Sequence, residues 1–148
     1  MRTGFRTKLV VATVAVLLAA GSFTLFAPSR PAVAFSSGGL FLDVQVESAT
    51  LVARGAAVDV TLEVTCSGTS TAEVFVTVSQ KAGSGVARGS GFETVGCTGS
   101  GEQVVVRVLA SPGKTFKQGI AVVSAEIFAC GTRVCGSETD SETVELRR

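Results

Sequence analysis

Apolar and polar residues alternate along most of the chain beyond residue 40. In AVDVTLEVTC, residues 57–66, every second side chain is apolar and most of those between are polar. Successive side chains of a β-strand point to opposite faces, so this pattern predicts a strand with one face on a core and one in water. The same alternation occurs in residues 41–47, 71–80, 102–110 and 141–148.

Two further segments extend this series. Residues 120–130, IAVVSAEIFAC, are apolar on nearly both faces and predict a central strand, whereas GFETVGC, residues 91–97, predicts a weaker one. Gly-containing turn signals separate the segments, and no stretch shows a helical period. About seven such strands predict an all-β fold, an immunoglobulin-like antiparallel β-sandwich.

A glycine-rich stretch interrupts the alternation between residues 83 and 91. Gly83-Ser84-Gly85 and Gly89-Ser90-Gly91 flank Val86-Ala87-Arg88. A phosphate-binding loop of this composition needs a helix after it, and the sequence predicts none there. We therefore expect a flexible hairpin loop.

The N-terminal segment has the three-part layout of a secretory signal. Arg2, Arg6 and Lys8 precede an apolar run from Leu9 to Ala20, and a small-x-small site ends at Ala34. This predicts a signal peptide over residues 1–34, cleavage between Ala34 and Phe35, and one domain over residues 35–148. Residues 9–27 carry no charge and are long enough to span a bilayer, so an uncleaved anchor is the alternative.

Charge narrows the range of partners. Residues 35–148 contain 9 Lys or Arg and 12 Asp or Glu, a net charge of about −3. Nucleic-acid binding calls for a basic face and is not expected. No further apolar segment follows, so we expect a secreted extracellular protein without a membrane span after cleavage. Its partner is unknown, with a protein or a cell-envelope component as the expectation.

Four cysteines follow the cleavage site: Cys66, Cys97, Cys130 and Cys135. An even number in an exported chain indicates two disulfides, and four cysteines allow three pairings. We favour Cys66–Cys97 with Cys130–Cys135, because each pair is expected to meet at a strand end. The motif CGTRVC is a poor redox or zinc motif, since redox pairs usually enclose two residues and the chain has no histidine to complete a zinc site.

The lack of histidine excludes much catalytic chemistry. Ser-His-Asp and Cys-His nucleophilic schemes and histidine metal ligands are all removed. Glu138, Asp140 and Glu142 alternate near the C-terminus, but no calcium-binding loop motif accompanies them, so we expect an acidic, solvated approach to the last strand. We predict no enzyme activity, no cofactor and no metal site.

Two residues stand out as contact candidates. Arg133 lies within the CGTRVC loop, as a basic residue does in some small protease inhibitors. Phe75 lies on the otherwise polar face of its strand, where it either seeds a contact patch or covers a second layer. The chain has no Trp or Tyr, which argues against sugar binding by aromatic stacking.

Several short motifs carry a resemblance. They are VTC (64–66), VFVTVSQ (74–80), ARGSG (87–91), VGCTG (95–99) and CGTRVCGS (130–137). With these the chain resembles small secreted actinobacterial proteins of uncharacterised function with a single immunoglobulin-like domain. It is more weakly similar to neocarzinostatin-type apoproteins, secreted sandwiches with two disulfides, one of which closes a CxxxxC loop.

These observations favour a secreted, disulfide-stabilised, non-catalytic interaction or structural module. Two alternatives stay open. The likeness to neocarzinostatin-type apoproteins implies a carrier of a small apolar ligand, and Arg133 suggests a protease inhibitor acting through the Cys130–Cys135 loop.

Overall fold

The computed structural model describes residues 39–148, and all of its long elements are strands. They are β1 (Phe41–Val52), β2 (Ala57–Ser67), β3 (Thr71–Ala82), β4 (Gly85–Gly96), β5 (Glu102–Ala110), β6 (Gly119–Cys130) and β7 (Cys135–Leu146), with a short 3-10 turn η1 (Ala53–Gly55) after β1. The predicted seven-stranded, all-β immunoglobulin-like fold is confirmed. The predicted signal peptide and its cleavage site at Ala34–Phe35 lie outside the described residues.

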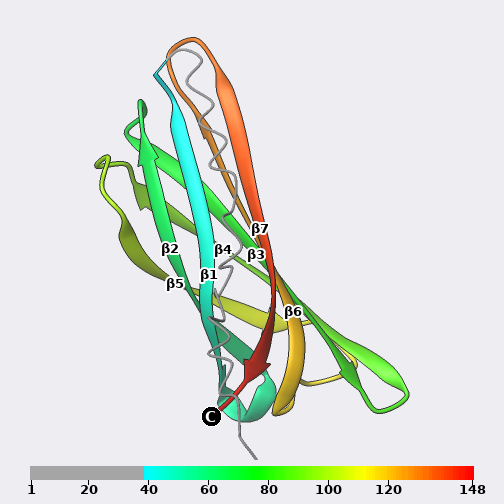
Figure 1. Cartoon of the computed structure of the whole chain (residues 1–148). Helices are drawn as coiled ribbons and strands as arrows, with labels where there is room; N and C mark the ends of the chain where they lie inside the picture. The colour runs from blue at the N-terminus through cyan, green and yellow to red at the C-terminus, as the bar shows by residue number, and fades with distance from the viewer. Residues whose placement is uncertain (1–38) are drawn as a thin grey trace, which may run out of the picture. The chain divides into compact units, whose positions relative to one another are not determined.

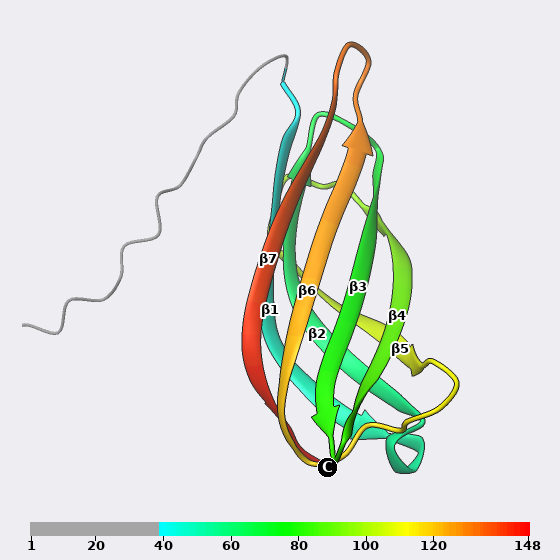
Figure 2. The ribbon, with the colours of Figure 1, turned by 90° about the vertical axis from the view of Figure 1, so that its right-hand side faces the viewer.

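The strands are hydrogen-bonded in the order β1-β2-β5-β4-β3-β6-β7, with every neighbouring pair antiparallel. The link between β4 and β5 is only two residue pairs long, Gly89 with Ala110 and Ser90 with Leu109. At this point the sheet folds over on itself. One layer is β1-β2-β5, and the other is β4-β3-β6-β7, whose strands lie side by side in Figure 2.

The two layers also meet along β1 and β7, which run parallel. The Leu51 N–H donates to the Arg147 carbonyl oxygen at 2.7 Å. Further along, β1 bulges between Val46 and Ser48, and the Val46 N–H donates to Asp140 Oδ2 at 2.9 Å. The Asp140 side chain on β7 thus accepts the hydrogen bond that a backbone carbonyl would accept in a regular ladder.

The core forms where the apolar faces of the two layers meet. Its largest fully buried side chains include Phe116, Leu62, Ile127 and Leu146, and valines supply most of the rest. The one buried polar side chain among the described residues is Gln80. Its Nε2 donates to the Lys117 carbonyl at 2.7 Å and its Oε1 accepts from the Lys117 N–H at 2.8 Å, so the buried amide is satisfied and holds the loop before β6 in place.

The structure corrects the prediction of a loop across residues 83–91. β4 begins at Gly85 and includes the Gly89-Ser90-Gly91 segment, so only the short turn between β3 and β4 remains. The glycines are needed for packing. A Cβ atom on Gly89 would lie 2.3 Å from the Leu109 carbonyl oxygen, and one on Gly91 would lie 2.3 Å from that of Arg107. Glycine at these positions lets the β5 backbone approach β4 closely.

Other strands are longer than predicted. β1 continues past residue 47 to Val52, and β7 begins at Cys135 instead of near residue 141. Glu138, Asp140 and Glu142 therefore lie inside a strand, not on a solvated approach to it. Among residues 39–148, no helix has the length and apolar character needed to cross a membrane.

We predict that Gly89→Ala destabilises the fold strongly while Gly96→Ala does not. The added Cβ at residue 89 meets the β5 backbone, which cannot move without disturbing the fold of the sheet, and the expected loss is about 3 kcal/mol or more in the free energy of unfolding. At Gly96 nothing lies within 4 Å, so alanine should change it by less than about 1 kcal/mol. Urea denaturation measures both, and equal losses would contradict the close approach.

Candidate functional site

Both disulfides lie toward one end of the sandwich. Cys66 at the end of β2 bonds to Cys97 just after β4, and Cys130 bonds to Cys135 across the turn from β6 to β7. This is the pairing that the sequence favours, and it leaves no free thiol in the chain. The first bridge joins the two layers, whereas the second closes a local turn.

Arg133 is exposed in the turn that the Cys130–Cys135 bridge closes. The Gly131 N–H donates to the Val134 carbonyl at 2.8 Å and further tightens this turn, which forms the tip of the β6–β7 hairpin in Figure 1. Arg133 is thus presented to solvent on a short, constrained loop. Its proposed use by a protease inhibitor stays a prediction.

Three of the four acidic residues of β7 lie on the inner side of the strand. Glu138, Asp140 and Glu142 are in register with the buried β6 residues Ile127, Ala125 and Val123. Asp140 accepts the hydrogen bond from the β1 backbone, so its role is to close the junction between the layers. Among residues 39–148, no group of three or more His, Cys, Asp or Glu side chains is arranged to hold a metal ion.

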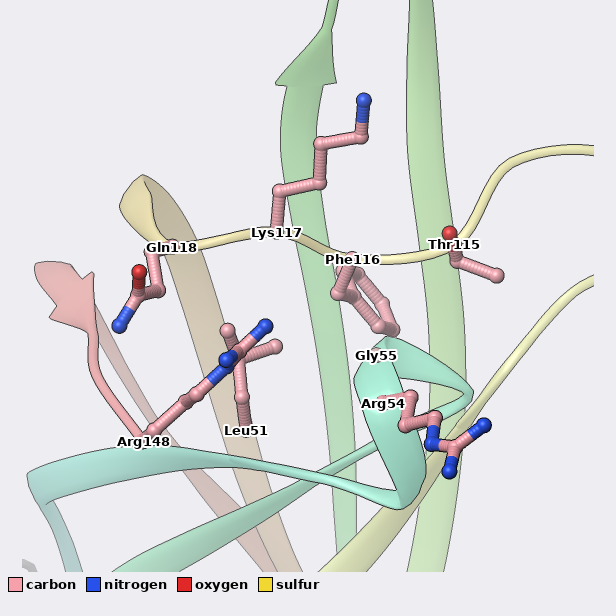
Figure 3. Close-up of a pocket in the computed structure, with 8 residues that line it drawn as sticks. All are labelled: Leu51, Arg54, Gly55, Thr115, Phe116, Lys117, Gln118 and Arg148. Carbon is pink, nitrogen blue, oxygen red and sulfur yellow. The ribbon is translucent and has the colours of Figure 1, made fainter.

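A pocket of about 840 Å³ opens at the other end of the sandwich. Its lining includes Leu51 and Phe116 together with the cationic residues Arg54, Lys117 and Arg148. Figure 3 shows that these three cationic side chains point in different directions and that Arg54 extends away from Arg148. The cations therefore do not converge on a point where one small anion would bind.

The outer face of the β1-β2-β5 layer carries one well-defined ion pair. Arg107 on β5 is directly opposite Asp59 on β2 and donates two hydrogen bonds to its carboxylate, at 2.7 and 2.8 Å. These bonds lower the pKa of Asp59 below its ordinary value of 3.8; burial acts in the opposite direction and the charge of Arg107 adds to the lowering. The pair links two neighbouring strands on an exposed face.

The outer face of the other layer is different, because large apolar side chains gather on it. We call the outward side of β4, β3, β6 and β7 the four-strand face. Nine large apolar residues of the described chain are strongly exposed, and six of them lie on this face: Phe75, Val86, Phe92, Ile120, Val122 and Phe128. They are 40–70% exposed, and the rings of Phe75 and Phe92 are 6.4 Å apart.

Sequence reasoning found only part of this face. The sequence predicts Phe75 as a contact candidate, and in the structure its side chain is 43% exposed and not covered by another layer. Phe92, at 70% the most exposed of the group, is not among the predicted contact candidates, because residues 91–97 predict only a weak strand. The signal for Phe92 is the alternation of larger residues with Ala or Gly from Val86 to Phe92, which indicates one outward face of a strand that begins at Gly85.

We predict that the two disulfides contribute unequally to stability. The Cys66–Cys97 bridge spans 31 residues and the Cys130–Cys135 bridge spans 5. Loop-closure entropy then gives about 4 kcal/mol for the first and about 2 kcal/mol for the second. Urea denaturation of Cys66→Ala/Cys97→Ala and of Cys130→Ala/Cys135→Ala measures the two losses, and a larger loss from the short bridge would contradict this ranking.

We predict that Asp59 contributes to acid sensitivity. Because its folded pKa is lowered, the carboxylate stabilises the fold at neutral pH, and this contribution disappears as the pH falls below 3.8 through the folded pKa. The Asp59→Asn variant should be slightly less stable than the wild type at pH 7, and this difference should vanish at low pH. Denaturation midpoints measured across this range test it, and a gap that widens on acidification would refute it.

Comparison with known proteins adds little to the site. No protein-family model matches the chain, and no curated protein matches it. Among solved structures, the chain is similar to the crystal structure of AggA, the major subunit of aggregative adherence fimbriae type I from Escherichia coli. The sequence identity is 13%, the match covers 72% of this chain and 93% of that one, and the TM-score is 0.36. A likeness at that level carries no argument about function.

Proposed function

We propose that the protein is a secreted, non-catalytic binding module and that the four-strand face is its binding surface. The supporting observation is the concentration of exposed large apolar side chains on that single face. Exposed apolar residues scattered singly are ordinary on protein surfaces, whereas a contiguous group of them is typical of an interaction site.

The aromatic residues are suited to anchor a partner. Phe75 and Phe92 sit on paired strands, so the β-sheet fixes the positions of their backbones. A phenylalanine buries a large apolar area and has few rotamers to lose on binding. Binding to this face therefore requires little reorganisation of the protein.

Secretion and lack of catalysis rest on several independent observations. Two disulfides are typical of proteins from oxidising compartments, and the N-terminal sequence has the pattern of an export signal. All four cysteines are paired and the chain has no histidine, so neither a thiol nucleophile nor a histidine base is available. A module that binds without transforming its partner fits this composition.

The other functions considered have less support. A carrier of an apolar ligand needs a concave apolar cleft, and the pocket at the η1 end is rimmed by three cationic side chains. An inhibitor acting through Arg133 is supported only by the exposure of that residue. Full trypsin activity in the presence of excess protein would dispose of the inhibitor hypothesis.

We predict that a photo-crosslinking residue placed on the four-strand face captures a macromolecule. The variant Phe92→p-benzoylphenylalanine keeps an aromatic ring at a position that is 70% exposed, so it should fold normally. Irradiation in the culture medium of the source organism should give a defined adduct that mass spectrometry can identify.

The matched control is Gln103→p-benzoylphenylalanine, which places the same group on an exposed position of β5 in the other layer. This control should give no defined adduct. Equal capture from both positions, or none from residue 92, would contradict the assignment of the four-strand face.

A further inference from the structure

The four-strand face is divided by charge along the direction of its strands. The register of the sheet arranges its outward residues in five rows, each of which crosses β4, β3, β6 and β7 in that order. The first two rows are Thr94-Glu73-Phe128-Ser137 and Phe92-Phe75-Glu126-Thr139, and the third is Ser90-Thr77-Ser124-Ser141. The last two rows are Arg88-Ser79-Val122-Thr143 and Val86-Lys81-Ile120-Glu145. We refer to them as rows one to five.

Rows one and two form an acidic and aromatic half. Phe75 is directly opposite Phe92 on one side and Glu126 on the other, and Glu73 is opposite Phe128. Both glutamates are exposed beside the aromatic rings. This half of the face contains no basic residue.

Rows four and five form a basic and aliphatic half. Arg88 and Lys81 are both exposed, and Val86, Ile120 and Val122 are 49–63% exposed around them. The acidic residue of this half, Glu145, already pairs with Arg147 at 2.6 Å. The half therefore presents positive charge among aliphatic side chains.

Row three separates the two halves and consists of hydroxyl side chains only. Thr77 is opposite Ser90 and Ser124, and the Ser141 hydroxyl donates to that of Ser124 at 2.9 Å. Hydroxyl groups both donate and accept hydrogen bonds. A row of them can thus pair with an identical row.

From this pattern we propose that the partner of the four-strand face is a second copy of the same chain, bound face to face about a two-fold axis that runs along row three. The proposal rests on the function proposed above and names its partner. A rotation about that axis turns the face onto itself and reverses the strand direction, so that row one of one copy meets row five of the other and row two meets row four. A two-fold interface must be complementary to itself in this way.

Three of the opposed pairs are complementary in chemistry, whereas Glu126 faces Val122 and Phe75 faces Ser79. Each strand lies over the same strand of the second copy, so Glu73 faces Lys81 and Phe128 faces Ile120. Phe92 faces Arg88, an arrangement in which a guanidinium group can stack on an aromatic ring. A two-fold axis along the strands would instead place each row on itself and bring like charges together, which charge repulsion disfavours.

The face is large enough for such an interface. Four strands about 4.8 Å apart and nine residues rising about 3.3 Å each give a projected area of roughly 550 Å². Because side chains stand out from the sheet, the accessible area exceeds the projected area and approaches the roughly 800 Å² that each partner buries in a standard interface.

Charge reversal tests the proposal in the purified protein. Sedimentation equilibrium of the wild type should show a dimer that weakens as salt is added. The variants Glu73→Lys/Glu126→Lys and Lys81→Glu/Arg88→Glu should each weaken self-association by at least about tenfold, because residues 73 and 81 then face each other with like charge and the two facing halves have the same sign. A 1:1 mixture of the two variants should form a dimer again, since each reversed half meets its complement in the other variant.

Glu63→Lys/Glu102→Lys is the control, because it reverses two exposed charges on β2 and β5 and should leave the dimer intact. Far-UV circular dichroism and urea midpoints establish that all variants are folded. A wild type that stays monomeric up to about 1 mM, variants that dimerise like the wild type, or a mixture that stays monomeric would each overturn the proposal. If residue 92 then crosslinks a different macromolecule, the binding face stands and only its partner changes; if it crosslinks nothing, both proposals fail.

Discussion

A two-layer sandwich has one dry interior, so each strand can bury only one of its two faces. In this chain the constraint is met by valine-rich alternation in β2, β3 and β5, whose buried positions recur at every second residue. β6 breaks the pattern because it is apolar on nearly both faces. Its inward residues Val123 and Ile127 are fully buried, whereas Ile120 and Val122 on its other face remain exposed. Because β6 has apolar residues on both faces and the fold buries only one of them, Ile120 and Val122 stay exposed.

Much of this architecture can be predicted from the sequence, because apolar residues at every second position of a strand all face the core. Segments such as 57–66 and 71–80 form strands with the predicted faces, and the cysteines bond in the favoured pairs. The sequence predicts a hairpin loop at Gly89 and Gly91, because glycine is usually a local turn signal. Here glycine is required because the backbone of β5, the next strand along the chain, approaches it closely, and this approach is visible only in the tertiary structure. The same limit explains why Phe92 was missed.

The hydrogen-bond partner of Asp140 is a second feature that a single sequence does not supply. Acidic residues before a C-terminal strand usually lie in solvent, and the alternation of Glu138, Asp140 and Glu142 fits that expectation. In the structure the strand begins earlier, and Asp140 accepts the Val46 N–H at the β1 bulge. Charged residues that point inward on a terminal strand also discourage pairing with the edge of another sheet. Their position protects the junction between β1 and β7.

This protection bears on how copies of the chain can associate. A β-sandwich can extend through free strand edges or through its outer faces. In this protein β1 and β7 close against each other through the Leu51–Arg147 hydrogen bond, and β4 and β5 are joined where the sheet folds over. These contacts cover part of the strand edges, while the four-strand face keeps its apolar residues in solvent. The charges on that face then decide the arrangement, because apolar burial alone has no direction and would permit either two-fold axis.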